Sequence, residues 1–420
     1  MGNIFEIFSV YKVIFSALLS FWWIIFPPLL YFAFKLLWMD FVIAYSKNSW
    51  LGNLKWTMLE IIPPRELERG PKPMESIFHG LAGVIETNNA FKDFLAGRIT
   101  DRFSLEMVSL GGEVHFYIRT QKKFKNMIES NVYAQYPDAE VIEVEDYMQK
   151  FPKVVPNKYW QVWGADMELL KPDPYPIRTY DNFEEDITGT MIDPVSSFTE
   201  IMGSLPPGQN MCLQFIVTPL EENWRDAEMK IVDELSKKEK AEPKGPFEHL
   251  KEVFTHLPGG FVAPIEYPQK AKKEDQPLEF KLTPGEKEIL KAVEENLSKN
   301  MFRTKMRVIY LGKKEGFNMS FVNGFFGALR QFNSLNLNGF KPNNISKTFA
   351  YYVSVDKRAN YRKRKIYRRY RDRDLDGVKF VLSTSELATV YHFPDMGVKS
   401  PSVSRVGAKT GTAPYNLPIQ

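Results

Sequence analysis

Cysteine and histidine are scarce in this sequence, which has one cysteine, Cys212, and five histidines among 420 residues. A single cysteine excludes an internal disulfide and every metal site built from several cysteines. The histidines lie far apart, and no pair has the His-Glu-x-x-His spacing of a zinc site, so we interpret them as surface and edge residues. We therefore expect no bound metal and no cofactor.

Motifs of the common enzyme classes are also missing. The sequence has no Gly-x-Ser-x-Gly, no kinase motif set and no dinucleotide-binding fingerprint. Near the C-terminus, GAKTGT has the residue types of a P-loop in the wrong order, because Lys409 precedes the second glycine and Pro414 would interrupt the following helix. Acidic runs such as residues 184–186 are typical of solvated turns. We expect that the chain is not an enzyme.

Charge is absent from residues 13–34. Twenty-two uncharged residues are enough for a helix across the roughly 30 Å hydrocarbon core of a bilayer. The flanking sequence lacks the basic segment and the cleavage site of a signal peptide, so we predict a retained membrane anchor. Because Pro27 and Pro28 lie in mid-span, three arrangements stay open: one kinked helix, a helix continued by an interfacial stretch over 29–45, or a hairpin. Lysine and arginine are more frequent after the span, which predicts that the bulk of the chain is cytoplasmic.

The next hundred residues alternate between strand and helix patterns. Gly111 and Gly112 join two of the strands as a tight hairpin turn. The β-α-β-β-α-β order predicts a ferredoxin-like split βαβ unit over residues 49–152. Its expected elements are strand 56–62, helix 74–86, strands 103–110 and 113–120, helix 122–136 and strand 139–147.

A second unit of the same kind is predicted over residues 153–356, so the expected fold class is α+β with two tandem ferredoxin-like α/β sandwiches. A charged insertion rich in proline and glycine, around 238–283, interrupts it. Thr283 and Glu286 then have the spacing of a capping box that opens a helix over 283–299. The other expected elements are strand 158–170, helix 193–205, strand 210–220, helix 224–238, strand 302–314, helix 318–332 and a last strand at 347–355 or 378–383.

The most unusual composition lies at residues 357–373, where ten of 17 residues are lysine or arginine. On a helix these charges extend nearly all the way round, so we expect no ordinary amphipathic face. Three binding partners stay open for this segment. It could bind a nucleic acid, with its cations on the phosphates and its interleaved tyrosines stacked on the bases; it could bind anionic lipid; or it could bind an acidic protein. The candidate binding residues are Lys357, Arg358, Arg362, Lys363, Arg364, Lys365, Arg368, Arg369, Arg371 and Arg373.

The stretch STSELATVYHFP, residues 383–394, follows the basic helix and resembles the segment just ahead of the motor domain in HerA/FtsK-like ATPases. These ATPases are membrane-anchored relatives of the conjugation coupling proteins and type IV secretion ATPases of bacteria. The stretch WTMLEIIPPRELERGPKPMESIFHGLAG, residues 56–83, is similar to the opening of their non-motor domain. Residues 395–420 look like the linker that precedes the motor, so no ATP-binding residue is carried over to this chain.

The resemblance implies a non-catalytic scaffold at the bacterial inner membrane, part of a type IV secretion or conjugation-like translocation machine. Its implied partners are the membrane, a HerA/FtsK-like P-loop ATPase and further copies of the chain, with nucleic acid as another contact of the basic helix. The alternative is a structural membrane protein that binds a cytoplasmic partner or anionic lipid and has no role in transport. The expected order is an anchor (1–48), the two units, the basic helix with a closing strand and helix (357–394), and a linker tail (395–420).

Overall fold

The computed structural model describes most of the chain outside its two ends. The described residues are 22–38, 54–64, 70–84, 101–183, 193–221, 223–236, 282–350 and 354–395, with the single positions 16, 20 and 52. The expected insertion around 238–283 and the tail with GAKTGT therefore lie almost entirely outside the described residues.

The described strands form one nine-stranded sheet in which all pairs are antiparallel. The strand order is β4-β1-β3-β2-β6-β7-β5-β8, and β9 also pairs with β7. This confirms the predicted mixed α+β class. The strands are β1 (Trp56–Ile62), β2 (Phe103–Leu110), β3 (Glu113–Gln121), β4 (Glu140–Val144), β5 (Trp160–Leu169), β6 (Gln209–Pro219), β7 (Met301–Lys313), β8 (Phe340–Pro342) and β9 (Phe380–Ser383).

The two halves of the sheet repeat one arrangement. In the first half the elements run β1-α4-β2-β3-α6-β4, and in the second they run β5-α7-β6-β7-α12-β8, with two further described helices between β6 and β7. Within each half the fourth, first, third and second strands are neighbours in that order, and the two second strands, β2 and β6, pair at the seam. The four helices are α4 (Lys72–Ala82), α6 (Lys125–Gln135), α7 (Ser196–Gly203) and α12 (Met319–Leu329).

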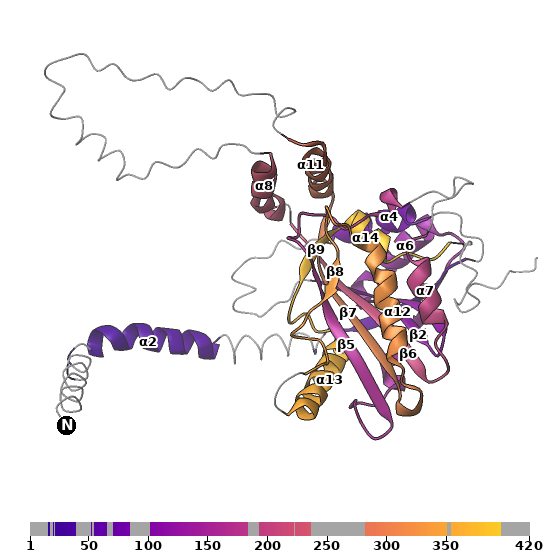
Figure 1. Ribbon diagram of the computed structural model, residues 1–420, viewed down its shortest axis with the longest axis horizontal. Coiled ribbons are helices and arrows are strands. Elements are labelled where there is room, and N and C mark those ends of the chain that lie inside the picture. Colours follow the sequence, from indigo (N-terminus) through magenta and orange to yellow (C-terminus); the bar gives the residue numbers. More distant parts are fainter. Residues whose placement is uncertain are drawn as a thin grey trace, which may run out of the picture.

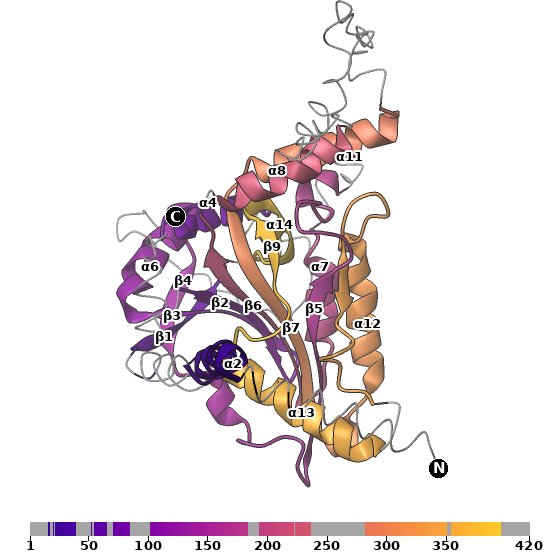
Figure 2. The same ribbon diagram turned by 90° about the vertical axis from the view of Figure 1, so that its left-hand side faces the viewer.

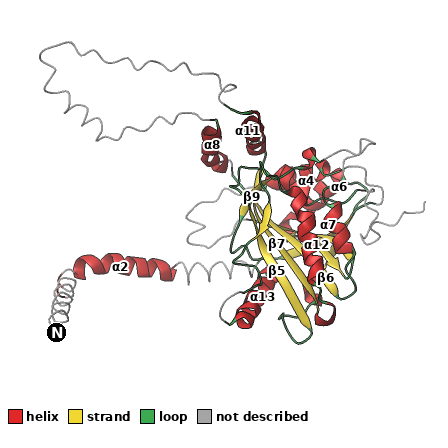
Figure 3. Ribbon diagram, in the orientation of Figure 1, coloured by secondary structure: helices red, strands yellow, loops and turns green. Residues whose placement is uncertain are grey.

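Helices cover both faces of this sheet. Residues of α4, α6, α7 and α12 share one large apolar core with the strands, and Figures 1 and 3 show these helices together on one side. Helix α13 (Val355–Arg371) contributes to a second core on the opposite face. Helices α8 (Asn223–Leu235) and α11 (Pro284–Leu297) form a third cluster and lie side by side in Figure 2. The capping box of Thr283 and Glu286 at the start of α11 is confirmed.

The segment that carries the family resemblance, residues 383–394, is buried in the large core. Its helix α14 (Thr384–Val390) packs against α4, and β9 just before it pairs with β7. The Tyr391 hydroxyl donates to the Tyr117 carbonyl, and the Phe393 ring meets Phe116 edge-on at 5.2 Å between centroids. The end of the described chain is thus fastened to the first half of the sheet.

The last strand of the second half differs from both expected positions. The fourth strand is β8, only three residues long, and it pairs with β5. Residues 347–350 form no strand, and β9 is the expected strand at 378–383 but pairs with β7 instead. A three-residue strand has too few positions to show the period of two on which the prediction depended.

Helix α2 (Trp22–Leu37) contains Pro27 and Pro28 and lies away from the sheet in Figure 1. Apolar side chains along it are exposed, for example Trp23 at 62% and Phe32 at 61%. Among the described residues, no helix is both long and apolar enough to cross a bilayer. The transmembrane span expected over 13–34 is therefore not found, and most of its first half lies outside the described residues.

Candidate functional site

Helix α13 packs on the sheet through a narrow apolar face. Ile366, Tyr367 and Tyr370 are buried there against Val162 and Ile309 of the strands. The expectation of no ordinary amphipathic face did not anticipate this narrow packing surface. Its face consists of one isoleucine and two tyrosines set among cations, and the long stems of neighbouring basic residues can lie along the same surface.

The tyrosines of α13 have two different roles. The Tyr367 hydroxyl donates to the Pro152 carbonyl at 2.6 Å, and the Tyr370 and Tyr147 hydroxyls are 2.5 Å apart. Tyr361 is 66% exposed. Of the three tyrosines that were expected to stack on bases, only Tyr361 is therefore open to a ligand.

Beneath α13, four buried polar side chains form a row across the seam between the two halves. Glu106 on β2 is registered with Gln214 on β6, Gln214 with Arg307 on β7, and Arg307 with Asp166 on β5. All four are at most 2% exposed. Arg307 Nε lies 2.8 Å from Asp166 Oδ1, and Arg307 Nη1 donates to Gln214 Oε1 at 3.2 Å.

This polar row holds the C-terminal end of α13. The last carbonyl groups of a helix have no partner within the helix and carry partial negative charge. Arg307 Nη1 donates to the Arg369 carbonyl at 2.7 Å, and Gln214 Nε2 donates to the Tyr370 carbonyl at 3.2 Å. The guanidinium of Arg307 also reaches the Asp374 carbonyl at 3.1 Å. The sheet therefore fixes both the position and the direction of α13.

Arg373, just after α13, is buried and structural, so its prediction as a partner-binding residue was wrong. Its guanidinium donates to both carboxylate oxygens of Glu106, at 2.9 and 3.1 Å, and it also binds Asp146. Burial opposes the charge of Glu106, but the Arg373 charge and hydrogen bonds keep the pKa of this carboxyl below its ordinary value. The positive φ of 49° at Arg373 turns the chain so that its side chain points back under the helix.

The charges under α13 balance. Three carboxylates, on Glu106, Asp146 and Asp166, form ion pairs with three cations, on Lys305, Arg307 and Arg373. Burial lowers the pKa of Lys305 to about 8, although Asp166 at 3.3 Å opposes this shift. The formal charges of these six groups cancel, whereas the exposed charges of α13 lie on its outer surface.

The other nine predicted binding residues divide by exposure. The half-buried residues make local contacts: Arg362 donates to the Lys347 and Phe349 carbonyls, Arg371 to the Lys153 carbonyl, and Arg369 lies 3.6 Å from Asp374. Lys363 and Lys365 are also half-buried. The exposed residues, which we call the outer cations of α13, are Lys357, Arg358, Arg364 and Arg368.

Three of the outer cations of α13, Lys357, Arg364 and Arg368, are exposed without a carboxylate partner among the described residues. Beside them, a cleft of about 310 Å³ lies between α13 and residues 343–346. Arg362, Lys365 and Arg369 line this cleft. Together they make a positively charged surface on a helix that the polar row holds in place.

Two features of the structure were missed from the sequence. The polar row appears there as single charged or amide residues inside apolar strands, such as Glu106 in FSLEMVSL and Arg307 in MRVIYL. His392 is fully buried and is not a surface residue. Its Nε2 lies 3.0 Å from Asp193, and its Nδ1 donates to the Ala388 carbonyl at 2.7 Å.

Within the described residues, no group of three or more histidine, cysteine or acidic residues could hold a metal ion.

Comparison with known families gives one match. The model of a family described as a domain of unknown function, DUF8128, matches residues 50–406. The match begins just before β1 and includes α13 and the closing segment with α14. No curated protein matches the chain significantly.

Proposed function

The chain belongs to the DUF8128 family, and we propose that it is a non-catalytic, membrane-anchored scaffold that docks a P-loop ATPase in a type IV secretion or conjugation-like translocation machine. The observation that carries this proposal is the outer surface of α13. Its cations project from a helix whose C-terminal end is held by buried side chains of the sheet. A rigid, charged surface of this kind suits binding to an anionic partner rather than catalysis.

We further propose that each half of the sheet is a ferredoxin-like unit and that the two halves arose by duplication. The shared order of four strands and two helices supports this, with α8 and α11 as an addition between β6 and β7 of the second half. Pairing of β2 with β6 along eight registered positions, from Phe103 with Val217 to Leu110 with Asn210, makes one continuous layer from the two units. Such a layer is a suitable body for a scaffold because it places α13 at a fixed position relative to both units.

The identity of the partner comes from the resemblance to HerA/FtsK-like proteins. Residues 56–83 and 383–394 carry that resemblance, and they include the whole of β1, α4 and α14. We propose on this ground that the docked protein is a HerA/FtsK-like ATPase and that several copies of the chain assemble around it. The outer cations of α13 would meet acidic side chains of the motor.

Anchoring at the bacterial inner membrane, with the bulk of the chain cytoplasmic, is part of the same proposal. The exposed aromatic and aliphatic side chains of α2 support it, since such side chains are stable in an apolar environment and costly in water. The same side chains, together with the outer cations, also support the alternative of a structural membrane protein whose α13 binds anionic lipid.

Substitution of Leu30 and Phe32 in α2 by lysine tests the anchor. Both side chains are exposed on α2, and a lysine at the centre of a membrane helix costs about 2.5–3.5 kcal/mol on insertion scales. We expect the native chain to stay in the membrane fraction after carbonate extraction and the double variant to move largely to the soluble fraction.

A matched control replaces Leu335 and Ile345, which are exposed on the folded body, by lysine. This control is expected to remain with the membranes. The anchor would be disproved by a native chain that is released completely by carbonate.

A further inference from the structure

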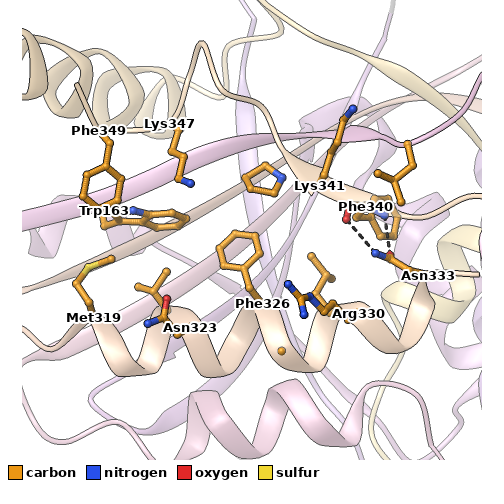
Figure 4. A pocket seen from close by; sticks show the side chains of 15 residues that line it. Trp163, Met319, Asn323, Phe326, Arg330, Asn333, Phe340, Lys341, Lys347 and Phe349 are labelled. Carbon is orange, nitrogen blue, oxygen red and sulfur yellow. Dashed lines mark hydrogen bonds between the residues drawn. The ribbon is translucent and has the colours of Figure 1, made fainter. Parts of the chain in front are cut away.

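A pocket of about 700 Å³ lies on the opposite face of the sheet from α13. It is bounded by α12, by β5 and β8, and by the segment that follows β8 (Figure 4). We call it the α12 pocket. Its principal lining residues are Trp163, Phe326, Arg330, Phe340, Lys347 and Phe349.

Aromatic rings form the walls of the α12 pocket. Trp163 of β5 and Phe326 of α12 meet edge-on, with ring centroids 5.4 Å apart. Phe340 lies at the β8 end of the pocket and Phe349 beside Trp163 (Figure 4). Such walls favour a flat, apolar ligand, because aromatic rings pack in offset or edge-on contacts.

The charged residues that line the α12 pocket are all cations. They are Arg330, Lys341 and Lys347, and no aspartate or glutamate lines the pocket. Lys341 is 3.5 Å from Glu168, whereas no ion pair or side-chain hydrogen bond joins Arg330 to another described residue. Figure 4 shows the ends of Arg330 and Lys347 directed into the pocket from opposite sides. This arrangement favours an anion.

The third feature of the α12 pocket is the buried indole of Trp163. Trp163 is 4% exposed, and its Nε1 has no hydrogen-bond acceptor in the described part of the chain. A buried donor without an acceptor costs about 1–3 kcal/mol, so such groups are rare in folded proteins. Because this nitrogen has almost no accessible surface, a ligand in the pocket meets the ring of Trp163 and not its N–H.

We propose that the α12 pocket binds a small organic anion with a flat aromatic body. The ring lies among Trp163, Phe326 and Phe340, and the anionic group pairs with Arg330 and Lys347. The volume falls within the roughly 300–1,000 Å³ range of small-molecule sites. The site lies across the sheet from α13, and Arg362 of that helix supports its rim by donating to the carbonyls of Lys347 and Phe349.

Two fluorescent dyes that differ in charge test the proposal on the full chain. One is 8-anilinonaphthalene-1-sulfonate, and the other is N-phenyl-1-naphthylamine, which has the same rings without the sulfonate. We expect the sulfonate dye to bind at one site per chain. Replacing Arg330 and Lys347 by glutamine should weaken it at least tenfold and change the neutral dye less than twofold.

A blocking variant separates the pocket from the other apolar surfaces of the chain. Asn323 is exposed on α12 and points into the pocket (Figure 4), so Asn323→Trp should abolish binding at this site. Asn223→Trp on α8 is the matched control and should leave both dyes unchanged, and thermal unfolding checks that all variants fold. The proposal is overturned if the native chain does not bind the sulfonate dye, if Asn323→Trp leaves binding unchanged, or if the double glutamine variant binds both dyes as the native chain does.

Discussion

Replacing Arg373 by methionine is expected to lower the free energy of unfolding by about 3–5 kcal/mol. The substitution leaves the Glu106 carboxylate, which is 0% exposed, without two hydrogen bonds from the guanidinium. A buried charge without a partner is far more costly than a buried pair. Because small domains are stable by only about 5–15 kcal/mol, urea denaturation followed by circular dichroism will resolve the effect.

Two further variants identify the cause of this loss. Arg371→Met, two positions earlier, removes one hydrogen bond from a half-buried side chain to the Lys153 carbonyl and should cost less than about 1 kcal/mol. Adding Glu106→Gln to Arg373→Met removes the uncompensated charge and should recover part of the stability. A cost below about 1 kcal/mol for Arg373→Met alone would contradict the role assigned to the buried ion pair.

Replacing the four outer cations of α13 by glutamine is expected to weaken binding of a single-stranded oligodeoxynucleotide, used as a polyanion probe. Each phosphate neutralised on a single strand contributes about −0.7 to the slope of log K against log salt. Removing four cations therefore makes this slope shallower by about 3, which corresponds to a loss of about a thousandfold in affinity near 0.05 M salt. Fluorescence anisotropy at several salt concentrations measures both quantities.

The control replaces four exposed cations of the α8–α11 pair, Arg225, Lys230, Lys287 and Lys291, by glutamine. It changes the net charge by the same amount, so an equal loss in both variants would show that α13 has no special role. Vesicles with and without phosphatidylserine distinguish the lipid alternative, since the α13 variant should then lose binding to the anionic vesicles alone.

Local pattern in the sequence was enough to predict most strands and helices. Alternating apolar residues marked β3, and the Gly111-Gly112 turn between β2 and β3 has the positive φ angles, 64° and 102°, that a tight hairpin requires. Strand β8 was missed because three residues carry no usable period. The packing face of α13 was missed because the hydrophobic pattern there is carried by tyrosines, which also occur on surfaces.

The site was less predictable because it depends on contacts between distant parts of the chain. The basic composition of α13 identified its outer cations but could not separate them from Arg373, whose partner Glu106 is 267 positions away in the sequence. Which cation is exposed and which is buried follows only from where the last turn of α13 meets β2, β6 and β7. The α12 pocket likewise combines β5 with α12 and β8, which lie more than a hundred residues further along the chain.

Photo-crosslinking from Tyr361 in the native cell tests the central claim, docking of a P-loop ATPase on α13, most directly. Tyr361 is the exposed aromatic residue of the helix, so p-benzoylphenylalanine replaces it with little disturbance, and Tyr133 of α6, 41% exposed on the other side of the sheet, is the control position. The account predicts a crosslink from Tyr361, and none from Tyr133, to a HerA/FtsK-like ATPase identified by mass spectrometry. Crosslinks from Tyr361 only to lipid, only to nucleic acid or to the same proteins as from Tyr133 would contradict it.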